Sequence, residues 1–477
     1  MKAWTRHGLP AVAALSVLLS GPARERFDVI HGLRGVGVLS LAAALMFAGR
    51  LARADWGTAE WASAAAWVAM AVGGACALSP AYALAPLALF AGCFAIALGT
   101  SWREGERENW LTWLALAAVA VAALGMLESM GLGPQSLRGR APSSTMGQRN
   151  TLAHFLVLAS PLVWAQAVRA GSRRSQVAWL FAAALLAAVV VQTRCRAAWG
   201  VGPAVLFCFV LLVRTRAALG VAGAVVSAVA IAAVAPVGLR WTEPHPFADT
   251  FSRLAEWRTG SGAGRIAEWA ASSRLFLEHR LLGIGPGNWF VEYGVAHNGD
   301  HFPHADGLAL LVERGAIGTG LALTVATAVL HGWKERRDVL GWPLVASTVL
   351  AAGALGAFDS VLQLPAPLLW LTLVCFVGLR SAATPVRAPA LALALVVLAV
   401  GAALSFGSRL LSTSDATPFD RLELAATLDP FDGELRLALA EAWISAGRCD
   451  QAARHLEAAQ QLLPLHPQLP GLTAACR

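Results

Sequence analysis

Windows of about 20 apolar residues recur along most of the chain, and they constrain its fold more than any other feature. A bilayer's hydrocarbon core is about 30 Å thick, so a helix needs roughly 20 apolar residues to cross it. We identify about thirteen such windows, at 8–22, 35–51, 60–78, 81–99, 110–129, 151–168, 176–192, 199–213, 217–238, 307–330, 341–358, 364–379 and 388–406. The sequence therefore predicts an all-α, polytopic helical bundle of about 12–13 spans. The first window also has the pattern of a cleaved signal peptide.

The composition agrees with a membrane protein. Hydrophobic residues make up 57% of the 477 residues and charged residues only 14%, with a mean hydropathy of +0.59. Soluble domains average about 45–50% apolar and about 25% charged residues. These values disfavour a soluble globular enzyme and exclude a disordered or disulfide-rich secreted chain.

Basic residues orient the predicted spans. With the N-terminus inside, the inner segments hold 16 basic residues and the short outer segments hold 8. The positive-inside rule favours this orientation. It places a long loop at 239–306 and the C-terminal tail outside, which is the periplasmic side of a bacterial inner membrane.

Three arginines depart from this bias because they lie at outer span ends: Arg149, Arg194 and Arg196. Two interpretations remain open. Their guanidinium groups reach the lipid–water interface while the stems stay in apolar surroundings, or they form a ring that binds phosphate at the outer membrane surface.

The long outer loop contains a predicted helix at about 264–279, followed by a turn. Its apolar positions, Ile266, Trp269, Ala270, Leu275 and Leu277, leave Arg265, Glu268 and Arg274 to other faces. The run GIGPGNW at 283–289 is typical of a turn. The loop lacks the GxxxxGK[ST] pattern, which argues against a mononucleotide site. Nothing in the sequence indicates a nucleic-acid partner.

The segment after this turn places His304 directly before a helix predicted to begin near Ala305 or Asp306. A neutral imidazole at such a helix start can act as a general base, and the free N–H groups suit an anionic ligand. Two other interpretations are a surface histidine without a role and a metal cluster. The cluster would comprise His297, Asp300, His301, His304 and Asp306, but its spacing fits no established zinc pattern. We predict no metal and no cofactor.

Four segments together resemble the superfamily of O-antigen ligases and O-antigen polymerases, which are polytopic membrane glycosyltransferases. They are TMGQRNTLAHFLVLASPL (145–162), TRCRAAWG (193–200), the loop helix with LFLEHRLLGIGPGNW, and PHADGLALLVERGAIG (303–318). The order of the segments, with a long outer loop before the last spans, carries the resemblance over roughly 35–406. Cys195 stands where Ser is usual, Arg280 replaces Pro, and Ala305 and Gly307 replace Asn and Tyr.

The resemblance implies transfer of a glycan from a polyprenyl diphosphate to a hydroxyl acceptor outside the inner membrane. By family correspondence, Arg196 and Arg265 would hold the donor diphosphate, and His304 would accept or orient the proton of the acceptor hydroxyl. Arg149 is a further diphosphate-binding candidate from its position alone. Guanidinium groups suit this task because they make bidentate contacts to phosphate in a low-dielectric setting. The diphosphate carries the activation energy, so no nucleotide is needed.

Several activities fit this resemblance. A ligase transfers finished glycan to lipid A-core, a polymerase joins repeat units, and related members glycosylate proteins. The segment Glu313–Arg314–Gly315 after His304 favours the ligase. A transporter or flippase is an alternative from another class, but such proteins usually place charges in mid-span. Here the charges of interest lie at outer span ends and in one loop.

The membrane glycosyltransferase domain is predicted at 1–406 and an external helical domain at 407–477. The tail from 406 holds six Arg against nine Asp and Glu, so it is acidic in a chain of net charge +8. It resembles one and a half tetratricopeptide repeats, with Pro430 and Pro464 one 34-residue period apart. One and a half repeats are too few to be stable alone, because each repeat is stabilised by packing on its neighbours. We expect the tail to pack on the membrane domain or on an envelope protein.

The seven cysteines form no framework of disulfides. Cys76, Cys93, Cys195, Cys208 and Cys375 lie in or beside spans and are predicted to be small buried residues. Cys449 and Cys476 both lie in the external tail, where a disulfide can persist. A disulfide between them is a hypothesis that the sequence leaves open, with two free thiols as the alternative.

Overall fold

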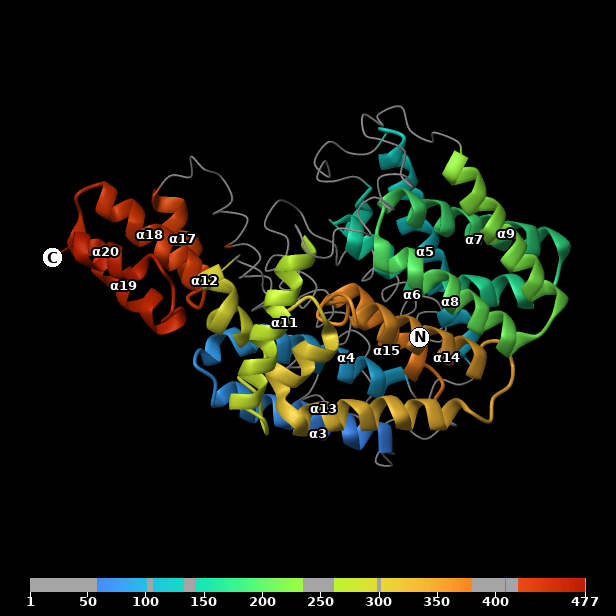
Figure 1. Ribbon diagram of the computed structural model, residues 1–477, viewed down its shortest axis with the longest axis horizontal. Helices are drawn as coiled ribbons and strands as arrows, with labels where there is room; N and C mark the ends of the chain where they lie inside the picture. The colour runs from blue at the N-terminus through green and yellow to red at the C-terminus, as the bar shows by residue number, and fades with distance from the viewer. Residues whose placement is uncertain are drawn as a thin grey trace, which may run out of the picture.

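The chain folds into helices throughout its described parts. The structure, a computed structural model, describes residues 58–100, 106–132, 142–146, 148–234, 261–297, 302–379, 408 and 419–476. Within these ranges all elements are helical, as Figure 1 shows, which confirms the predicted all-α class. The predicted windows at 8–22, 35–51 and 388–406 lie outside the described residues.

Among the described residues, six helices are long and apolar enough to cross a membrane. They are α5 (Arg107–Ser129), α6 (Arg149–Arg169), α7 (Arg173–Thr193), α8 (Arg196–Val213), α9 (Arg216–Val234) and α13 (Asp306–Trp333). Each overlaps one predicted window. The windows at 60–78, 81–99, 341–358 and 364–379 correspond to shorter apolar helices: α3 (Thr58–Ala75), α4 (Leu84–Thr100), α14 (Trp342–Gly356) and α15 (Pro365–Phe376).

Helix α6 is the central element of the bundle. It packs against α5, α7, α8, α14 and α15, and every residue from Thr151 to Ala167 is buried. Its core contacts include the edge-to-face pair of Phe155 and Trp370, with ring centroids 5.3 Å apart. Because protein surrounds this helix, polar side chains such as His154 lie within it without facing lipid.

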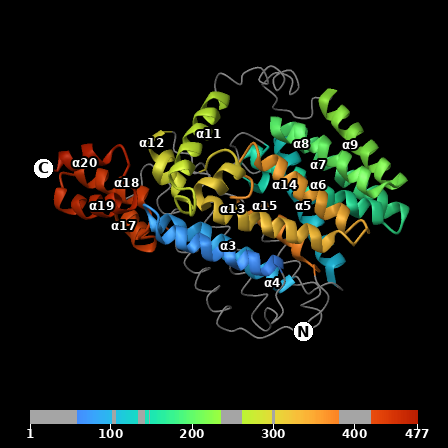
Figure 2. The ribbon, with the colours of Figure 1, turned by 60° about the horizontal axis from the view of Figure 1, so that its bottom comes forward.

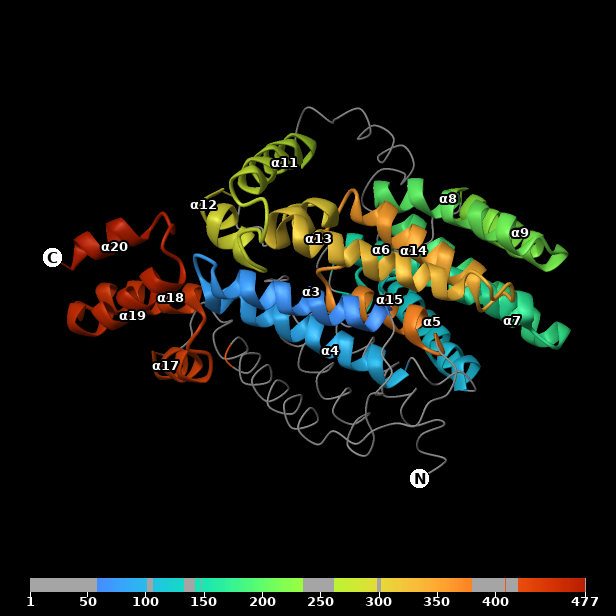
Figure 3. The same ribbon diagram turned by 90° about the horizontal axis from the view of Figure 1, so that it is seen from below.

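The helix starts of α6, α8 and α13 gather at one end of the bundle, which we call the site end. A two-residue connection places the end of α7 beside the start of α8, and α14 leads into a loop that contacts the start of α13. Figures 2 and 3 show α3 running beside α13, with α11 (Ser261–Glu278) at the same end as the start of α13.

Helix α13 is kinked at Gly315, whose backbone is not helical (φ 60°, ψ −170°). The kink frees backbone groups that must find other partners. The turn after α11 supplies them: Ile284 and Gly285 N–H donate to the Val312 and Glu313 carbonyls, and Ala316 and Ile317 N–H donate to those of Arg280 and Leu281. A Cβ at Gly283 or Gly315 would overlap backbone of the opposite segment. The predicted turn is confirmed, with positive φ at its three glycines.

We expect Gly315→Ala to destabilise the protein by roughly 2 kcal/mol or more, because the left-handed φ alone costs about 1–2 kcal/mol and the new methyl group overlaps the Leu281 carbonyl. Thermal unfolding of the detergent-solubilised protein measures this change. The control is Gly320→Ala in the same helix, where an added Cβ meets nothing within 4 Å. Equal midpoints for the two variants would contradict the kink–turn docking.

The tail forms four helices: α17 (Phe419–Leu428), α18 (Gly433–Ser445), α19 (Cys449–Leu462) and α20 (Leu469–Ala475). α18 packs against its three neighbours. Just after α19, Leu463 is fully buried in a cluster with Phe290 and Val291 of the external loop. The expected packing of the tail on the membrane domain is therefore present. The resemblance to tetratricopeptide repeats and the exact domain boundary stay predictions.

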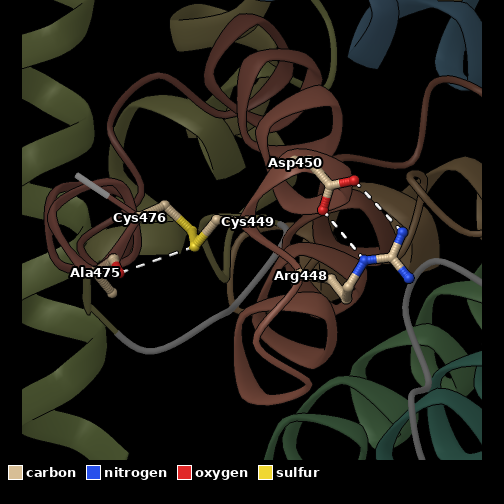
Figure 4. Close-up of a disulfide and its surroundings, with 5 residues drawn as sticks. All are labelled: Arg448, Cys449, Asp450, Ala475 and Cys476. Atoms are coloured by element: carbon tan, nitrogen blue, oxygen red, sulfur yellow. Dashed lines mark hydrogen bonds and ion pairs between the residues drawn. A yellow bond between two sulfur atoms is a disulfide. The ribbon is translucent and has the colours of Figure 1, made fainter.

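The hypothesised disulfide between Cys449 and Cys476 is confirmed. Figure 4 shows it joining the start of α19 to the end of α20, with Cα atoms 5.3 Å apart. The other predicted burials hold for Cys93, Cys195 and Cys375, whereas Cys76 is exposed. The bridge closes a segment of 27 residues within the tail.

Replacing both bridge cysteines by Ser should loosen the tail. Closing a loop of this length stabilises the folded state by about 3.5 kcal/mol in the chain-entropy account. Limited proteolysis of the full-length protein should therefore cut 419–476 faster in the Cys449→Ser/Cys476→Ser variant. Cys208→Ser in α8 is the control. An unchanged cleavage rate would show that packing alone holds α20.

Candidate functional site

Asp359 is the centre of a charged cluster at the site end. It lies in the loop between α14 and α15. The His304 Nδ1 donates to its Oδ1 at 3.1 Å. Its Oδ2 is 3.6 Å from an Arg265 guanidinium nitrogen and 3.9 Å from His154 Nδ1. One carboxylate thus joins side chains from α11, α6 and the segment before α13.

The electrostatics of this cluster favour the ionised carboxylate. Burial by itself would raise the pKa of Asp359. The hydrogen bond from His304 and the charges of His154, His304 and Arg265 outweigh burial and hold this pKa well below its usual range. The side chain of Asp359 is only 15% exposed, whereas Arg265 and His304 are 25% and 33% exposed. The cationic side of the cluster is therefore the side open to a ligand.

Backbone contacts fix the two loops that carry Asp359 and His304. Asp306, the first residue of α13, accepts hydrogen bonds from Val361 and Leu362 N–H, each at 2.9 Å. The Ser360 hydroxyl donates to the Pro303 carbonyl at 2.7 Å. These bonds hold the segment before α13 against the loop after α14, and they set the spacing between the imidazole and the carboxylate.

Helix α11 approaches the same cluster from outside. The Arg265 guanidinium donates to the Phe358 carbonyl at 3.0 Å, and the Trp269 indole donates to the His304 carbonyl at 3.3 Å. Arg265 and Trp269 lie one turn apart on this helix, so a single helix face contacts both loops. The position of α11 therefore determines where the Arg265 charge lies.

The predicted faces of α11 need a correction. Ile266 and Leu277, predicted to be on the packed face, are 50% and 55% exposed, whereas Glu268 is buried. The helix packs on α13, and its inward face carries polar and small residues, among them Ser272, which accepts a hydrogen bond from the Trp289 indole. Apolar periodicity misidentified the face because the inward face carries polar hydrogen-bonding residues.

A second contact links this cluster to the start of α8. His154 in α6 is buried, and its Nε2 lies 3.3 Å from the Sγ of Cys195. Cys195 is the residue before α8, and Arg196 is the first residue of that helix. The described connection from Arg196 to Asp359 therefore runs through Cys195 and His154.

The structure brings the predicted site residues to one end of the bundle. Arg265 and His304 meet directly at Asp359. Arg196 and Arg149 are the first residues of α8 and α6, and both are half-buried. Their roles toward a ligand stay predictions.

Sequence reasoning missed two residues of the cluster, Asp359 and His154. Each carried a signal. Asp359 is a carboxylate in a short outer loop between two predicted spans, and His154 is an ionisable residue inside a span, which by default indicates function. Neither signal identifies the partner, because Asp359 and His304 are 55 residues apart in the chain.

The metal interpretation gains no support in the described part of the chain. No group of three or more His, Cys, Asp and Glu residues there is arranged to hold a metal ion. Asp300 and His301, two members of the cluster considered from sequence, lie outside the described residues.

Removing the charge of Asp359 should destabilise the protein in a pH-dependent way. Folding lowers the pKa of Asp359. The contribution of its charge to the free energy of unfolding is therefore complete above the unfolded pKa of about 4 and is lost as the pH falls below that value toward the folded pKa. Asp359→Asn should cost roughly 1–3 kcal/mol at pH 7, because Arg265 and His304 lose a charged hydrogen-bonding partner but remain partly exposed.

Thermal unfolding of the solubilised protein at pH 7 and below about pH 4 measures this effect, since the difference between the two proteins should shrink in acid. Asp420→Asn, at an exposed site in the tail, is the control. A stability difference that does not vary with pH would contradict the assignment of the charge to the ionised carboxylate.

Comparison with known proteins supports the resemblance. Residues 181–323 match the family model described as O-antigen ligase. The match runs from α7 into α13, so it includes Arg196, Arg265 and His304, and it supports a membrane family that transfers glycans as ligases or polymerases. It spans under a third of the chain. No curated protein matches the chain.

Proposed function

We propose that this protein transfers a glycan from a polyprenyl diphosphate carrier to a hydroxyl acceptor at the outer, periplasmic surface of the bacterial inner membrane. The observation that carries the proposal is the contact of His304 and Arg265 with the single carboxylate of Asp359. This cluster lies within and beside the region that matches the O-antigen ligase family.

The arginines serve the departing diphosphate. One guanidinium nitrogen of Arg265 donates to the Phe358 carbonyl. The other lies 3.6 Å from Asp359, beyond hydrogen-bond distance, and its N–H groups can bind a better-placed anion. Arg196 at the start of α8 adds a second charge, and the free N–H groups of a helix start favour the same anion. Arg149 occupies the equivalent place on α6. As the anomeric C–O bond breaks, these groups stabilise the charge that develops on the leaving diphosphate.

His304 serves the acceptor. Asp359 accepts the hydrogen bond of Nδ1–H, so the neutral imidazole carries its lone pair on Nε2. Nε2 takes the proton of the acceptor hydroxyl as its oxygen bonds to the anomeric carbon, and Asp359 then stabilises the imidazolium. Attack opposite to the leaving diphosphate inverts the anomeric centre. No step of this transfer requires a nucleotide.

The acceptor we propose is lipid A-core, which makes the protein a ligase. This choice rests on the Glu313–Arg314–Gly315 segment that follows His304. A deletion strain distinguishes the activities. Loss of a ligase leaves unmodified core and accumulates long lipid-linked chains, whereas loss of a polymerase leaves core that bears one repeat unit. Unchanged lipopolysaccharide with under-glycosylated envelope proteins would indicate protein glycosylation.

The decisive assay is transfer by the purified protein. Reconstituted protein supplied with polyprenyl diphosphate-linked glycan and acceptor should release polyprenyl diphosphate in step with glycosylated acceptor. Movement of the lipid-linked glycan across the bilayer without release of polyprenyl diphosphate would instead establish a flippase.

Three alanine variants test the assigned roles. Arg196→Ala and Arg265→Ala should each lower the transfer rate by about 100-fold or more, and His304→Ala by about 100- to 10,000-fold. The measurement is initial rate in the reconstituted system at matched protein insertion. Arg274→Ala and His279→Ala, at exposed positions on or just after α11, are matched controls. Near-normal transfer by Arg196→Ala or His304→Ala would refute the site.

A further inference from the structure

One pair of buried polar groups at the site end has no part in the transfer steps above. His154 and Cys195 are 2% and 5% exposed. A buried imidazole and a buried thiol are costly unless each finds a partner. They find each other, with 3.3 Å between Nε2 and Sγ.

The other side of the imidazole faces the site. His154 Nδ1 lies 3.9 Å from Asp359 Oδ2, the oxygen that also faces Arg265. Thiol, imidazole and carboxylate therefore lie in succession, the first two at 3.3 Å and the last two at an ion-pair distance of 3.9 Å. We call this arrangement the Cys195 relay. It crosses from the start of α8, through α6, to the loop after α14.

Hydrogen bonds hold the backbone around Cys195, directly before Arg196 at the start of α8. Arg194 adopts a left-handed conformation (φ 56°), and the Cys195 N–H donates to the Thr193 hydroxyl at 3.3 Å. Cys195 then starts α8 with an extended backbone, and the Trp199 N–H donates to its carbonyl. These bonds hold the main chain, and the contact of the Cys195 thiol with His154 holds the side chain one residue before Arg196.

We propose that Cys195 and His154 are positioning residues of the transfer site. The thiol orients the imidazole, and the imidazole faces the second oxygen of Asp359. Through these contacts the relay keeps the Arg196 guanidinium positioned on the same site as Arg265 and His304. This inference rests on the proposed function for the role of Arg196. The pairing of Cys195 with His154 changes the reactivity of the thiol, and this reactivity can be measured without glycan transfer.

The electrostatics of the thiol agree with this geometry. Burial would raise the pKa of Cys195, but the charge of His154 and its hydrogen bond outweigh burial and lower this pKa below its usual value. The groups that face His154 in turn are Cys195, Asp359 and Arg265. A thiol paired in this way has thiolate character, which is the form that reacts with electrophiles.

Alkylation by iodoacetamide reads out the relay directly. Sγ bonds to the methylene carbon, the C–I bond breaks, iodide leaves, and the thiol proton remains on His154. Mass spectrometry of the peptide that contains Cys195 gives the rate in the full-length protein as a function of pH. Because Cys195 is 5% exposed, access sets the maximal rate and thiolate formation sets the pH midpoint. His154→Gln should raise this midpoint by about one pH unit and so slow alkylation about tenfold at pH 7, where an unpaired thiol is mostly protonated. The exposed Cys76 should react equally in both proteins.

Transfer kinetics test the positioning role. Cys195→Val removes the thiol contact and should raise the KM for the lipid-linked donor about tenfold, with a smaller change in kcat. Cys195→Ser keeps a donor and acceptor at this position and should restore most of the loss. His154→Gln combined with Cys195→Val should cost no more than the worse single variant, because both break the same relay. Cys208→Val in α8 is the control.

The outcomes separate this inference from the proposed function. Equal alkylation of Cys195 in the wild type and His154→Gln would overturn the relay whatever the protein transfers. If the wild type transfers glycan and Cys195→Val has an unchanged KM, the positioning role is refuted while the function stands. Slower alkylation in His154→Gln together with wild-type protein that transfers no glycan would refute the function and leave the relay as a paired thiol.

Discussion

The site end depends on the contacts of the largely buried Asp359 carboxylate, whose side chain is 15% exposed. A carboxylate in this position is stable only with cationic or hydrogen-bonding partners, and His304, Arg265 and His154 supply them. Each partner comes from a different segment, so satisfying one charge fixes the relative positions of α6, α11 and the start of α13. The same contacts leave Arg265 and His304 as the most exposed members of the cluster. Their exposure is what the proposed roles of Arg265 toward a diphosphate and of His304 toward an acceptor hydroxyl require.

Two features of the bundle make this arrangement stable. The first is the burial of α6, which protects His154 from lipid and lets it reach both Cys195 and Asp359. The second is the docking of the turn after α11 on the kink of α13. Backbone groups freed at Gly315 are satisfied by Ile284, Gly285 and the residues before them. The loop helix that carries Arg265 is thereby attached to the helix that follows His304.

Local patterns predicted much of this structure, each for a local reason. Apolar window length predicted the six long apolar helices of the described residues, because the bilayer sets the length of a crossing helix. The turn at 283–289 followed from glycines that must adopt positive φ. The shared location of Cys449 and Cys476 in the tail left their pairing open, and the structure shows the bridge. The inward face of α11 was predicted wrongly, because Glu268 is buried while Ile266 is exposed. Apolar periodicity identifies a packed face only where packing is apolar.

By itself, the sequence determined that this chain is a helical membrane protein with a long polar loop before its last spans and with His304 directly before a helix. Those properties depend on composition and on spacing within single segments. Only the tertiary structure decided that Asp359 joins Arg265 to His304 and that His154 joins Cys195 to the same carboxylate. These contacts link residues between 41 and 205 positions apart. Their physical cause is the need to neutralise and hydrogen-bond buried polar groups, and partners across such distances are chosen by packing.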